Sequence, residues 1–379
     1  MQKLLSILTF LLHLQGNALA CTTTAYLSES DDLFVGKSLD WNLVHGFVSV
    51  NPKGAQKRGL LLPGTSAQPI QWKAKYGSVT FDQVARNFPF GGMNQEGLMI
   101  EVMWLTETSP PPLKNDIPAI NESQYMQYLL DQASSVAAAV ELTKGIQVQK
   151  GAAPIHYLMC DKIRECAIVE FVSGERKIYR SSDDSMPYKA LTNNNYPNSL
   201  AFLKGFIGFG GSQSIPYGNS GSPSRFVIAI AESEKRNDPR DSRGRPDPVS
   251  KGFKILEKVM APNTAWQIVY DPAHEKISFR SRDSLAIKSV DLRQFKFDCN
   301  QGYLYHRINQ GSGDVSGQFE KITNAVSDEH IDKSSFIPAN LRPLLKQYDR
   351  ASPMDCSAPR LPASAPASTV RKASPAGRQ

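Results

Sequence analysis

The chain has 379 residues, of which 41% are hydrophobic and 21% charged, a composition typical of soluble globular proteins that excludes wholesale disorder. Its net charge of +7 and pI of about 9.0 first suggest a nucleic-acid or anionic-membrane partner. The chain has five cysteines, an odd number, so at least one of them has no partner within the chain.

Residues 1–20 have the three parts of a secretory signal peptide. Lys3 gives a short positive region, Leu4–Leu14 is an apolar run, and Ala18-Leu19-Ala20 offers small residues for cleavage. The apolar run is too short to span a membrane. We therefore expect a secreted or periplasmic protein in which residues 1–20 are removed and Cys21 becomes the N-terminus. A membrane anchor and a lipid-modified Cys21 are the alternatives.

The segment after residue 20 contains apolar runs of strand length that are bounded by turn residues. Cys21–Leu27 is rich in Thr and Tyr, and Leu33–Trp41 follows it after a polar turn, so the two predict an antiparallel hairpin. Further strands are expected at Gly97–Leu105, Ile155–Cys160, Cys166–Val172, Lys177–Tyr179, Lys189–Thr192, Trp266–Tyr270 and Lys276–Arg280.

The predicted hairpin brings charged residues to the new N-terminus. A turn centred in the polar segment sets Cys21 opposite about Leu39. Lys37 and Asp40 then lie within reach of the amine and thiol of Cys21, unless the register slips by a residue or two.

Two stretches predict helices. Glu122–Gly145 has an Ala-rich second half, and Ser222–Lys235 begins with Ser222 as a cap and Pro223 in its first turn. Helices that lie between groups of strands indicate an α+β domain of stacked layers. We expect this domain to span residues 21–356.

Ser357–Gln379 has the composition of a disordered tail. It is rich in Ala, Pro and Ser and has no aromatic residue with which to form a core. It holds four basic residues and no acidic one, so it carries more than half of the net charge: Arg360, Arg371, Lys372 and Arg378. The basic pI therefore gives no reason to expect a nucleic-acid partner, and once residues 1–20 are removed we expect no membrane partner.

The cysteines predict disulfides, because an exported protein meets an oxidising compartment. Cys160 and Cys166 flank a short turn between two apolar runs, so a hairpin places them opposite each other. Cys299 and Cys356 then pair, and Cys21 stays free, although other pairings remain open. A zinc site is the competing use of these residues, but the chain has no C-x-x-C pair and its six histidines are scattered.

An N-terminal Cys combines a nucleophile and a base. Its thiol can attack a carbonyl carbon while its own α-amine takes the proton. Such a residue needs a carboxylate to orient the amine, a cation to favour the thiolate, and donors for the oxyanion. Asp40 and Lys37 are the candidates for the first two of these groups.

Several short motifs follow Cys21 in order along the chain. They are Gly36-Lys37-Ser38-Leu39-Asp40-Trp41, Asn94-Gln95-Glu96-Gly97-Leu98, Leu191-Thr192-Asn193-Asn194, Ser222-Pro223-Ser224-Arg225-Phe226 and Trp266-Gln267-Ile268-Val269-Tyr270-Asp271. Behind a signal peptide that exposes Cys21, the series resembles the choloylglycine hydrolase family, the penicillin V acylases and bile salt hydrolases of the N-terminal nucleophile superfamily. The resemblance covers about residues 21–280.

The resemblance implies a four-layer αββα sandwich of the N-terminal nucleophile hydrolase type, and it implies roles for five residues. Cys21 matches the nucleophile, and Asp40 matches the carboxylate that holds its α-amine. Asn193 matches the oxyanion-hole amide, and Arg225 matches the arginine that supports the thiolate and the transition-state charge. Trp104 falls where the family contributes a backbone N–H to the oxyanion. In having Trp at this place the chain resembles the Gram-negative penicillin V acylases, whereas bile salt hydrolases usually carry Asn there.

Lys37 departs from the family pattern, which normally has arginine at this place. Lysine keeps the positive charge but loses the planar fork that holds a partner through two hydrogen bonds. The departure bears on how the thiolate is stabilised and leaves the reaction class unchanged.

The sequence thus predicts an exported cysteine hydrolase of linear amide C–N bonds that works through a thioester, with no metal or organic cofactor. Its expected partner is a small-molecule amide with an aromatic or apolar acyl group, such as penicillin V or an N-acyl homoserine lactone. A conjugated bile salt is the alternative substrate. A non-catalytic exported binding protein or lipoprotein that keeps the fold is the alternative from another class, and a homo-oligomer is left open.

Overall fold

Two β-sheets stack face to face in the computed structural model, which describes residues 21–357 apart from 152, 236–246, 335–336 and 355. The expected signal peptide and residues 358–379 of the expected tail lie outside the described residues. Within those residues one sheet has seven strands and the other has nine.

The strands of the seven-stranded sheet are, in order across the sheet, β14 (Ala190–Leu191), β1 (Thr22–Leu27), β2 (Leu33–Asp40), β15 (Thr264–Asp271), β16 (Lys276–Ser281), β17 (Ser284–Asp291) and β19 (Gly313–Asp314). Those of the nine-stranded sheet are β13 (Glu175–Arg180), β12 (Cys166–Val172), β11 (Ile155–Cys160), β8 (Met99–Trp104), β7 (Pro89–Asn94), β6 (Ser78–Asp82), β3 (Phe47–Asn51), β18 (Leu304–Arg307) and β20 (Glu320–Lys321). Two short ladders join β4 (Gln56–Arg58) to β5 (Gln71–Lys73) and β9 (Ala119–Asn121) to β10 (Gln147–Gln149).

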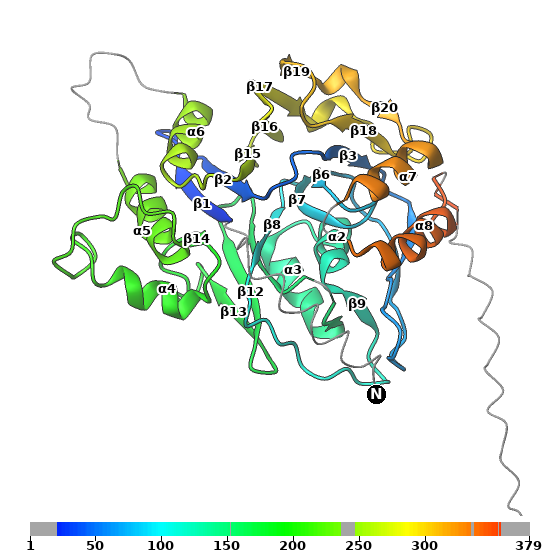
Figure 1. The fold of residues 1–379 in the computed structure, drawn as a ribbon, viewed down its shortest axis with the longest axis horizontal. Coiled ribbons are helices and arrows are strands. Elements are labelled where there is room, and N and C mark those ends of the chain that lie inside the picture. Colours follow the sequence, from blue (N-terminus) through cyan, green and yellow to red (C-terminus); the bar gives the residue numbers. More distant parts are fainter. Residues whose placement is uncertain (1–20, 152, 236–246, 335–336, 355, 358–379) are drawn as a thin grey trace, which may run out of the picture.

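Helices cover the outer face of each sheet (Figure 1). Helices α5 (Ser222–Ser233) and α6 (Pro248–Lys258) pack on β1, β2 and β15, and helices α2 (Glu122–Gln132) and α3 (Val136–Leu142) pack on β7, β8 and β12. The resulting order of helix, sheet, sheet and helix is the four-layer αββα sandwich that the family resemblance implied. The remaining helical elements are α4 (Tyr196–Leu203), α7 (Asn324–Lys333), α8 (Arg342–Ala351), η1 (Thr143–Gly145), η2 (Leu292–Gln294), η3 (Ser316–Gln318) and η4 (Ala339–Leu341).

Aromatic side chains hold the two sheets together. The ring of Phe81 on β6 lies 6.3 Å from Trp266, 6.3 Å from Tyr270 and 5.4 Å from Phe279, centroid to centroid, and these three rings come from β15 and β16 of the other sheet. All four side chains are almost fully buried. The contacts with Tyr270 and Phe279 are edge-to-face, and aromatic pairs of this kind each contribute about 0.5–1.5 kcal/mol beyond the burial of apolar area.

The helix predicted over Glu122–Gly145 is broken, so that prediction was wrong in extent. Helix α2 ends at Gln132 because Ala133 has extended backbone angles, and Ser135 begins α3 as its cap by accepting a hydrogen bond from the Ala138 N–H. A serine competes with the helical backbone for hydrogen bonds, which favours a helix start over a helix interior at this point.

Ser222 does not cap α5, contrary to the prediction. The cap is Gly221, Pro223 lies in the first turn as expected, and the helix ends at Ser233 rather than Lys235. The Ser222 hydroxyl instead accepts a hydrogen bond from the Asn193 N–H at 2.8 Å. From the first turn of α5 the Ser222 hydroxyl thus contacts the loop that carries Asn193.

Both expected disulfides are present. Cys160 and Cys166 join β11 to β12 at facing positions of the ladder. Cys299 and Cys356 close a loop with a sequence separation of 57. Cys21 is the free cysteine among the described residues.

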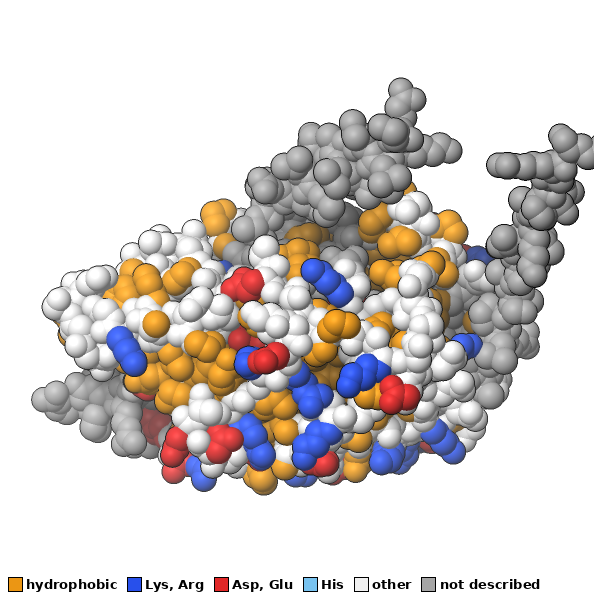
Figure 2. All heavy atoms as spheres, turned by 90° about the horizontal axis from the view of Figure 1, so that it is seen from below, with side chains coloured by type: hydrophobic (Ala, Val, Ile, Leu, Met, Phe, Trp, Pro, Cys, Tyr) orange, Lys and Arg blue, Asp and Glu red, His pale blue; other side chains and the backbone are white. Residues whose placement is uncertain are grey.

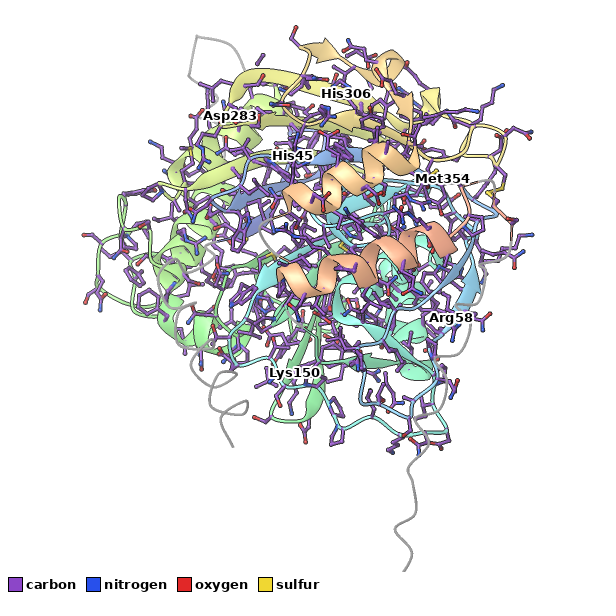
Figure 3. The ribbon with its side chains drawn as sticks, turned by 45° about the vertical axis from the view of Figure 1, so that its right-hand side comes forward. His45, Arg58, Lys150, Asp283, His306 and Met354 are labelled. Carbon is purple, nitrogen blue, oxygen red and sulfur yellow. A yellow bond between two sulfur atoms is a disulfide. The ribbon has the colours of Figure 1, made fainter. Side chains whose placement is uncertain are left out.

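The C-terminal helices α7 and α8 lie side by side (Figure 3), and polar contacts that are buried or partly buried hold them to the rest of the protein. His330 on α7 lies 3.0 Å from His45, and the Tyr348 hydroxyl on α8 donates to the Arg58 carbonyl at 2.6 Å. Arg86 also forms a buried ion pair with Asp349 at 2.7 Å. These contacts hold the helices in place although the chain reaches them only after both sheets are complete.

The surface seen in Figure 2 mixes charges of both signs. Lys and Arg side chains are interspersed there with Asp and Glu and with apolar side chains. Among the helices of the described residues, none has the length and apolar character needed to cross a membrane.

Candidate active site

Cys21 lies at the head of β1, against the inner face of the seven-stranded sheet. The ladder pairs Thr22 with Ser38, and this register continued by one residue sets Cys21 beside Leu39, as the sequence predicted. The short turn between β1 and β2 fixes the register. The Cys21 side chain is buried, with 3% of the residue exposed.

Strand β2 presents two charged groups to opposite sides, because side chains alternate along a strand. Lys37 points to the nine-stranded sheet, where its ammonium lies 3.2 Å from the Glu101 carboxylate on β8. Asp40 points to the helix layer, where its carboxylate lies 3.5 Å from the Arg225 guanidinium on α5. All four side chains are at most 1% exposed.

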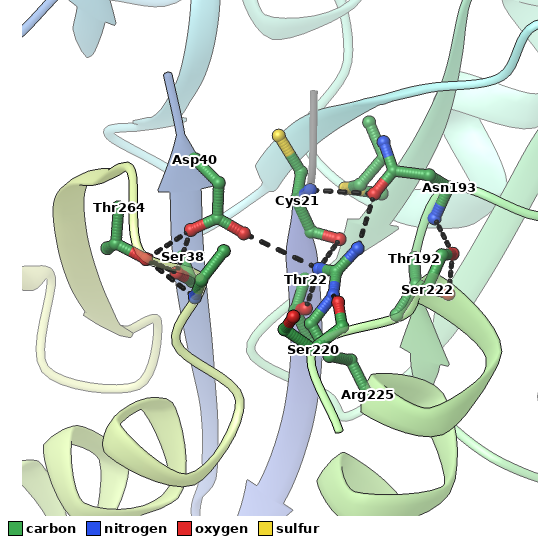
Figure 4. Close-up of polar contacts among 12 residues, drawn as sticks. Cys21, Thr22, Ser38, Asp40, Thr192, Asn193, Ser220, Ser222, Arg225 and Thr264 are labelled. Atoms are coloured by element: carbon green, nitrogen blue, oxygen red, sulfur yellow. Dashed lines mark hydrogen bonds and ion pairs between the residues drawn. The ribbon is translucent and has the colours of Figure 1, made fainter. Parts of the chain in front are cut away.

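Asn193, in the loop after β14, holds the backbone nitrogen of Cys21 (Figure 4). The Cys21 N–H donates to Asn193 Oδ1 at 2.7 Å, and Asn193 Nδ2 donates to the Trp104 carbonyl at 3.1 Å. The preceding Thr192 carbonyl accepts a hydrogen bond from His156 Nε2 at 2.7 Å. The side-chain amide of Asn193 is therefore fixed in one orientation.

Arg225 reaches the start of β1 from the first turn of α5. Its Nη1 donates to the Cys21 carbonyl at 2.7 Å and to Thr22 Oγ1 at 2.6 Å, and its Nη2 donates to Asn193 Oδ1 at 2.9 Å. One buried guanidinium thus joins the Cys21 backbone, Asn193 and Asp40. Figure 4 shows the Cys21 sulfur pointing away from this guanidinium.

The resemblance implied that the Asp40 carboxylate holds the Cys21 nitrogen. In the structure this nitrogen donates to Asn193 instead. The Asp40 carboxylate accepts from the Ser38 hydroxyl at 2.8 Å and from Thr264, and it pairs with Arg225. Burial raises the pKa of Asp40, and the Arg225 charge and these hydrogen bonds oppose that rise. In the full-length chain the Cys21 nitrogen is a peptide N–H, which has a single proton to donate.

Burial also raises the pKa of the Cys21 thiol above its usual value. The positive charge of Lys37 opposes this rise more than any other group, and the Asp40 carboxylate adds to it. The backbone N–H of Asp40 and the Arg225 guanidinium favour the thiolate by smaller amounts. The sulfur is thus a buried thiol whose ionisation is controlled by charges on both sides of the sheet.

An apolar pocket opens on Cys21 from the space between the sheets. Its lining includes two tryptophans, and its members come from both sheets and the loops between them: Cys21, Leu39, Trp41, Gln83, Phe90, Val102, Met103, Trp104 and Ile155. The half-buried Trp104 ends β8, and its carbonyl is the group that contacts Asn193. Such walls suit an aromatic or aliphatic group and offer few polar partners.

The structure therefore brings all six predicted site residues to the head of β1. It adds Glu101, His156 and Thr264, which sequence reasoning missed. Glu101 is a lone carboxylate in the otherwise apolar segment 97–105, and such a residue is rarely buried without a charged partner. That pattern is a usable signal for Glu101, whereas His156 and Thr264 have none, because each acts across a long sequence separation.

In the part of the chain that the structure describes, no three His, Cys, Asp or Glu side chains gather as a metal site would require.

Comparisons with known proteins agree on one family. The family model of linear amide C–N hydrolases, choloylglycine hydrolase family, matches residues 21–305. A penicillin V acylase from Pectobacterium atrosepticum is 26% identical over 349 residues, which are 80% of this chain and 90% of that protein.

Solved structures show the same fold. A penicillin V acylase from Agrobacterium tumefaciens superimposes with a TM-score of 0.67 at 23% identity, over 80% of this chain and 98% of that chain. A mutant of the conjugated bile acid hydrolase from Clostridium perfringens superimposes with a TM-score of 0.61 at 14% identity, over 78% of this chain and 98% of that chain.

The sandwich and the family match define a hydrolase that acts on carbon–nitrogen bonds, other than peptide bonds, in linear amides. The chain belongs to the choloylglycine hydrolase family. It is of the penicillin V acylase and bile salt hydrolase type.

Proposed function

We propose that this protein is an exported cysteine-nucleophile hydrolase that cleaves penicillin V or an N-acyl homoserine lactone at the acyl amide. The observation that carries the proposal is the position of Cys21, which is a free cysteine, immediately precedes β1 and lines an apolar pocket. Removal of residues 1–20 would turn its nitrogen into an α-amine beside Asn193 and Arg225. Export by this signal peptide would place the mature enzyme in the periplasm or outside the cell.

The first half of the proposed reaction transfers the acyl group to Cys21. The sulfur attacks the amide carbon, a C–S bond forms, and the thiol proton passes to the α-amine. The carbonyl oxygen becomes an oxyanion that Asn193 and the backbone N–H of Trp104 stabilise. The C–N bond then breaks, and the leaving amine takes the proton from the α-ammonium.

The second half releases the acid. Water attacks the thioester carbon while the α-amine takes one of its protons. The C–S bond breaks to release the carboxylic acid, and the Cys21 sulfur takes the proton back from the α-ammonium. Arg225 holds the Cys21 carbonyl and Asn193 through both halves, so that the nucleophile and the oxyanion donor keep one relative position.

The acyl group is assigned from the pocket. Trp41, Phe90 and Trp104 give it aromatic walls, and Leu39 and Ile155 extend them with aliphatic ones. A phenoxyacetyl or fatty acyl group would bury apolar surface against such walls. Each Å² buried would stabilise the complex by about 25 cal/mol.

A hydrolysis panel tests this proposal. Purified protein with its N-terminus determined by mass spectrometry is incubated with penicillin V, N-acyl homoserine lactones and glycocholate, alongside Cys21→Ala. We expect release of amine from penicillin V or the lactones and none from Cys21→Ala. Unchanged turnover in Cys21→Ala would refute the nucleophile, and a preference for glycocholate would assign a bile salt hydrolase instead.

The mature N-terminus separates the enzyme from the non-catalytic alternative. A free Cys21 is required if its α-amine is the base. A diacylglyceryl mass on Cys21, or cleavage at another bond, would contradict this mechanism and favour the lipoprotein.

A further inference from the structure

A buried ion pair joins the two sheets behind Cys21. Lys37 comes from β2 and Glu101 from β8, and their charged atoms are 3.2 Å apart with both side chains 1% exposed. Burying two charges is costly unless each finds further partners. The surroundings of both residues supply such partners.

The residues around the Glu101 carboxylate leave a space that fits it. The Tyr270 hydroxyl, from the other sheet, donates to Glu101 Oε1 at 2.5 Å. On the neighbouring strand the facing residue is Gly91, and a Cβ atom added there would lie 2.0 Å from the same oxygen. Any residue larger than glycine would displace the carboxylate.

The ammonium of Lys37 lies against the wall of the Cys21 pocket. It donates to the Val102 carbonyl at 2.5 Å and to Met103 Sδ at 3.4 Å, and both of these residues line the pocket with Cys21. Its direct contacts are thus with that wall and with Glu101, so it acts on the sulfur through its electric field.

The charges that face Cys21 come from two elements. Lys37 and Asp40 belong to β2, and Arg225 belongs to α5. Asp40 and Arg225 pair with each other, and their charges have opposite effects on the thiolate. The charge of Lys37 lowers the pKa of the Cys21 thiol more than any other group does. The groups that face Glu101 are Lys37 and Tyr270.

We propose that Glu101 is a positioning residue, which holds the Lys37 ammonium in place between the sheets so that its charge stabilises the Cys21 thiolate. A buried charge needs a counter-charge and hydrogen-bond partners to replace the water it has lost. Glu101 supplies that counter-charge, so the Lys37–Glu101 pair places a positive charge at a fixed position between the sheets. The inference rests on the proposed function in that it takes Cys21 as the nucleophile.

Alkylation of Cys21 tests the inference without any substrate. Iodoacetamide is added to the disulfide-intact protein over a pH series, and the modified Cys21 peptide is measured by mass spectrometry. In Lys37→Met we expect the midpoint of the rate profile to move up by about one pH unit, because the thiolate loses the positive charge near it. In Glu101→Gln we expect a shift in the same direction, because the Lys37 ammonium loses the carboxylate that holds it between the sheets. In the double variant we expect no further shift, because Glu101 acts through Lys37.

Two further variants keep the test decisive. Tyr270→Phe removes only the hydroxyl, so it should fold and move the midpoint in the same direction by less. Asp131→Asn is the matched control, because it breaks another fully buried lysine–carboxylate pair, with Lys57 at 2.8 Å. We expect the midpoint there to stay at the wild-type value.

The outcomes either support or overturn the inference. An unchanged or lower midpoint in Glu101→Gln, or shifts that add in the double variant, would overturn it. If the charge variants fail to fold, an unchanged midpoint in Tyr270→Phe overturns it. Turnover that survives in Cys21→Ala would instead refute the proposed function, and the alkylation profiles do not depend on that result.

Discussion

The two buried ion pairs on either side of β2 differ in how they reach Cys21. Arg225, paired with Asp40, donates directly to the Cys21 carbonyl and to Asn193. Lys37, paired with Glu101, contacts the pocket wall and influences the sulfur by charge. The comparison separates two effects on Cys21, the proposed nucleophile: one pair fixes its geometry, and the other lowers the cost of ionising its thiol.

Because a strand sends alternate side chains to opposite faces, one strand can contribute to both effects. The pair on the helix side has hydrogen bonds of fixed direction, so small changes in side-chain shape should be costly there. The pair between the sheets acts through an undirected field, so the sign of the charge should matter most. The following variants test this division.

Arg225→Gln should have the largest effect. It removes donors to the Cys21 carbonyl, Thr22 and Asn193 and leaves the Asp40 charge unpaired. We expect kcat/KM for the accepted amide to fall by about two to three orders of magnitude. We also expect urea unfolding to show a loss of about 3–5 kcal/mol. Arg225→Lys, which keeps only the charge, should recover little activity. Near-wild-type activity in Arg225→Lys would contradict the geometric role.

Lys37→Met should cost less and should depend on pH. Loss of the positive charge raises the pKa of the Cys21 thiol, so kcat/KM near neutral pH should fall about tenfold. The deficit should shrink as the pH rises, since alkali restores the thiolate. A pH-independent deficit would assign Lys37 a geometric role and erase the contrast with Arg225.

Asp40→Asn should move the thiol in the opposite direction. The Asp40 carboxylate raises the pKa of the Cys21 thiol, so its neutralisation should shift the alkylation midpoint to lower pH by less than about one unit. Activity should nevertheless fall severalfold, because Arg225 loses its counter-charge. A shift to higher pH would mean that Asp40 acts on Cys21 mainly through Arg225.

Ser222→Ala should have the smallest effect. It removes the acceptor of the Asn193 N–H, a contact worth about 1 kcal/mol or less, so we expect a loss of kcat of about threefold with KM unchanged. Ser220→Ala is the control, because Arg225 uses only the backbone carbonyl of Ser220. Equal losses in the two variants would indicate a general effect on this loop.

The part of the site that lies on one hairpin was predictable from sequence. The turn length alone set Cys21 beside Leu39 and brought Lys37 near, because pairing in a tight hairpin leaves little freedom of register. The Cys160–Cys166 bridge was accessible for the same reason. The layered α+β architecture also followed from the alternation of strand and helix patterns.

The long-range contacts were not predictable in this way. Asn193, 172 positions from Cys21, accepts from the nitrogen that Asp40 was expected to hold. Only the resemblance to a family brought Asn193 into the site, and no local pattern distinguishes it from its neighbours. The partnership of Lys37 with Glu101 depends on how two sheets stack, which periodicity within a strand does not specify.

The disulfide between Cys299 and Cys356 has a consequence for how the protein is made. It ties the C-terminal helices, which lie beyond the family match at residues 21–305, back to the shared body. Closing a loop of this length stabilises a protein by about 4 kcal/mol in the chain-entropy account. Thiols stay reduced in the cytosol, so protein produced there would hold α7 and α8 only by their noncovalent contacts. Recombinant protein should therefore be checked for free thiols before its thermal stability is compared with that of its relatives.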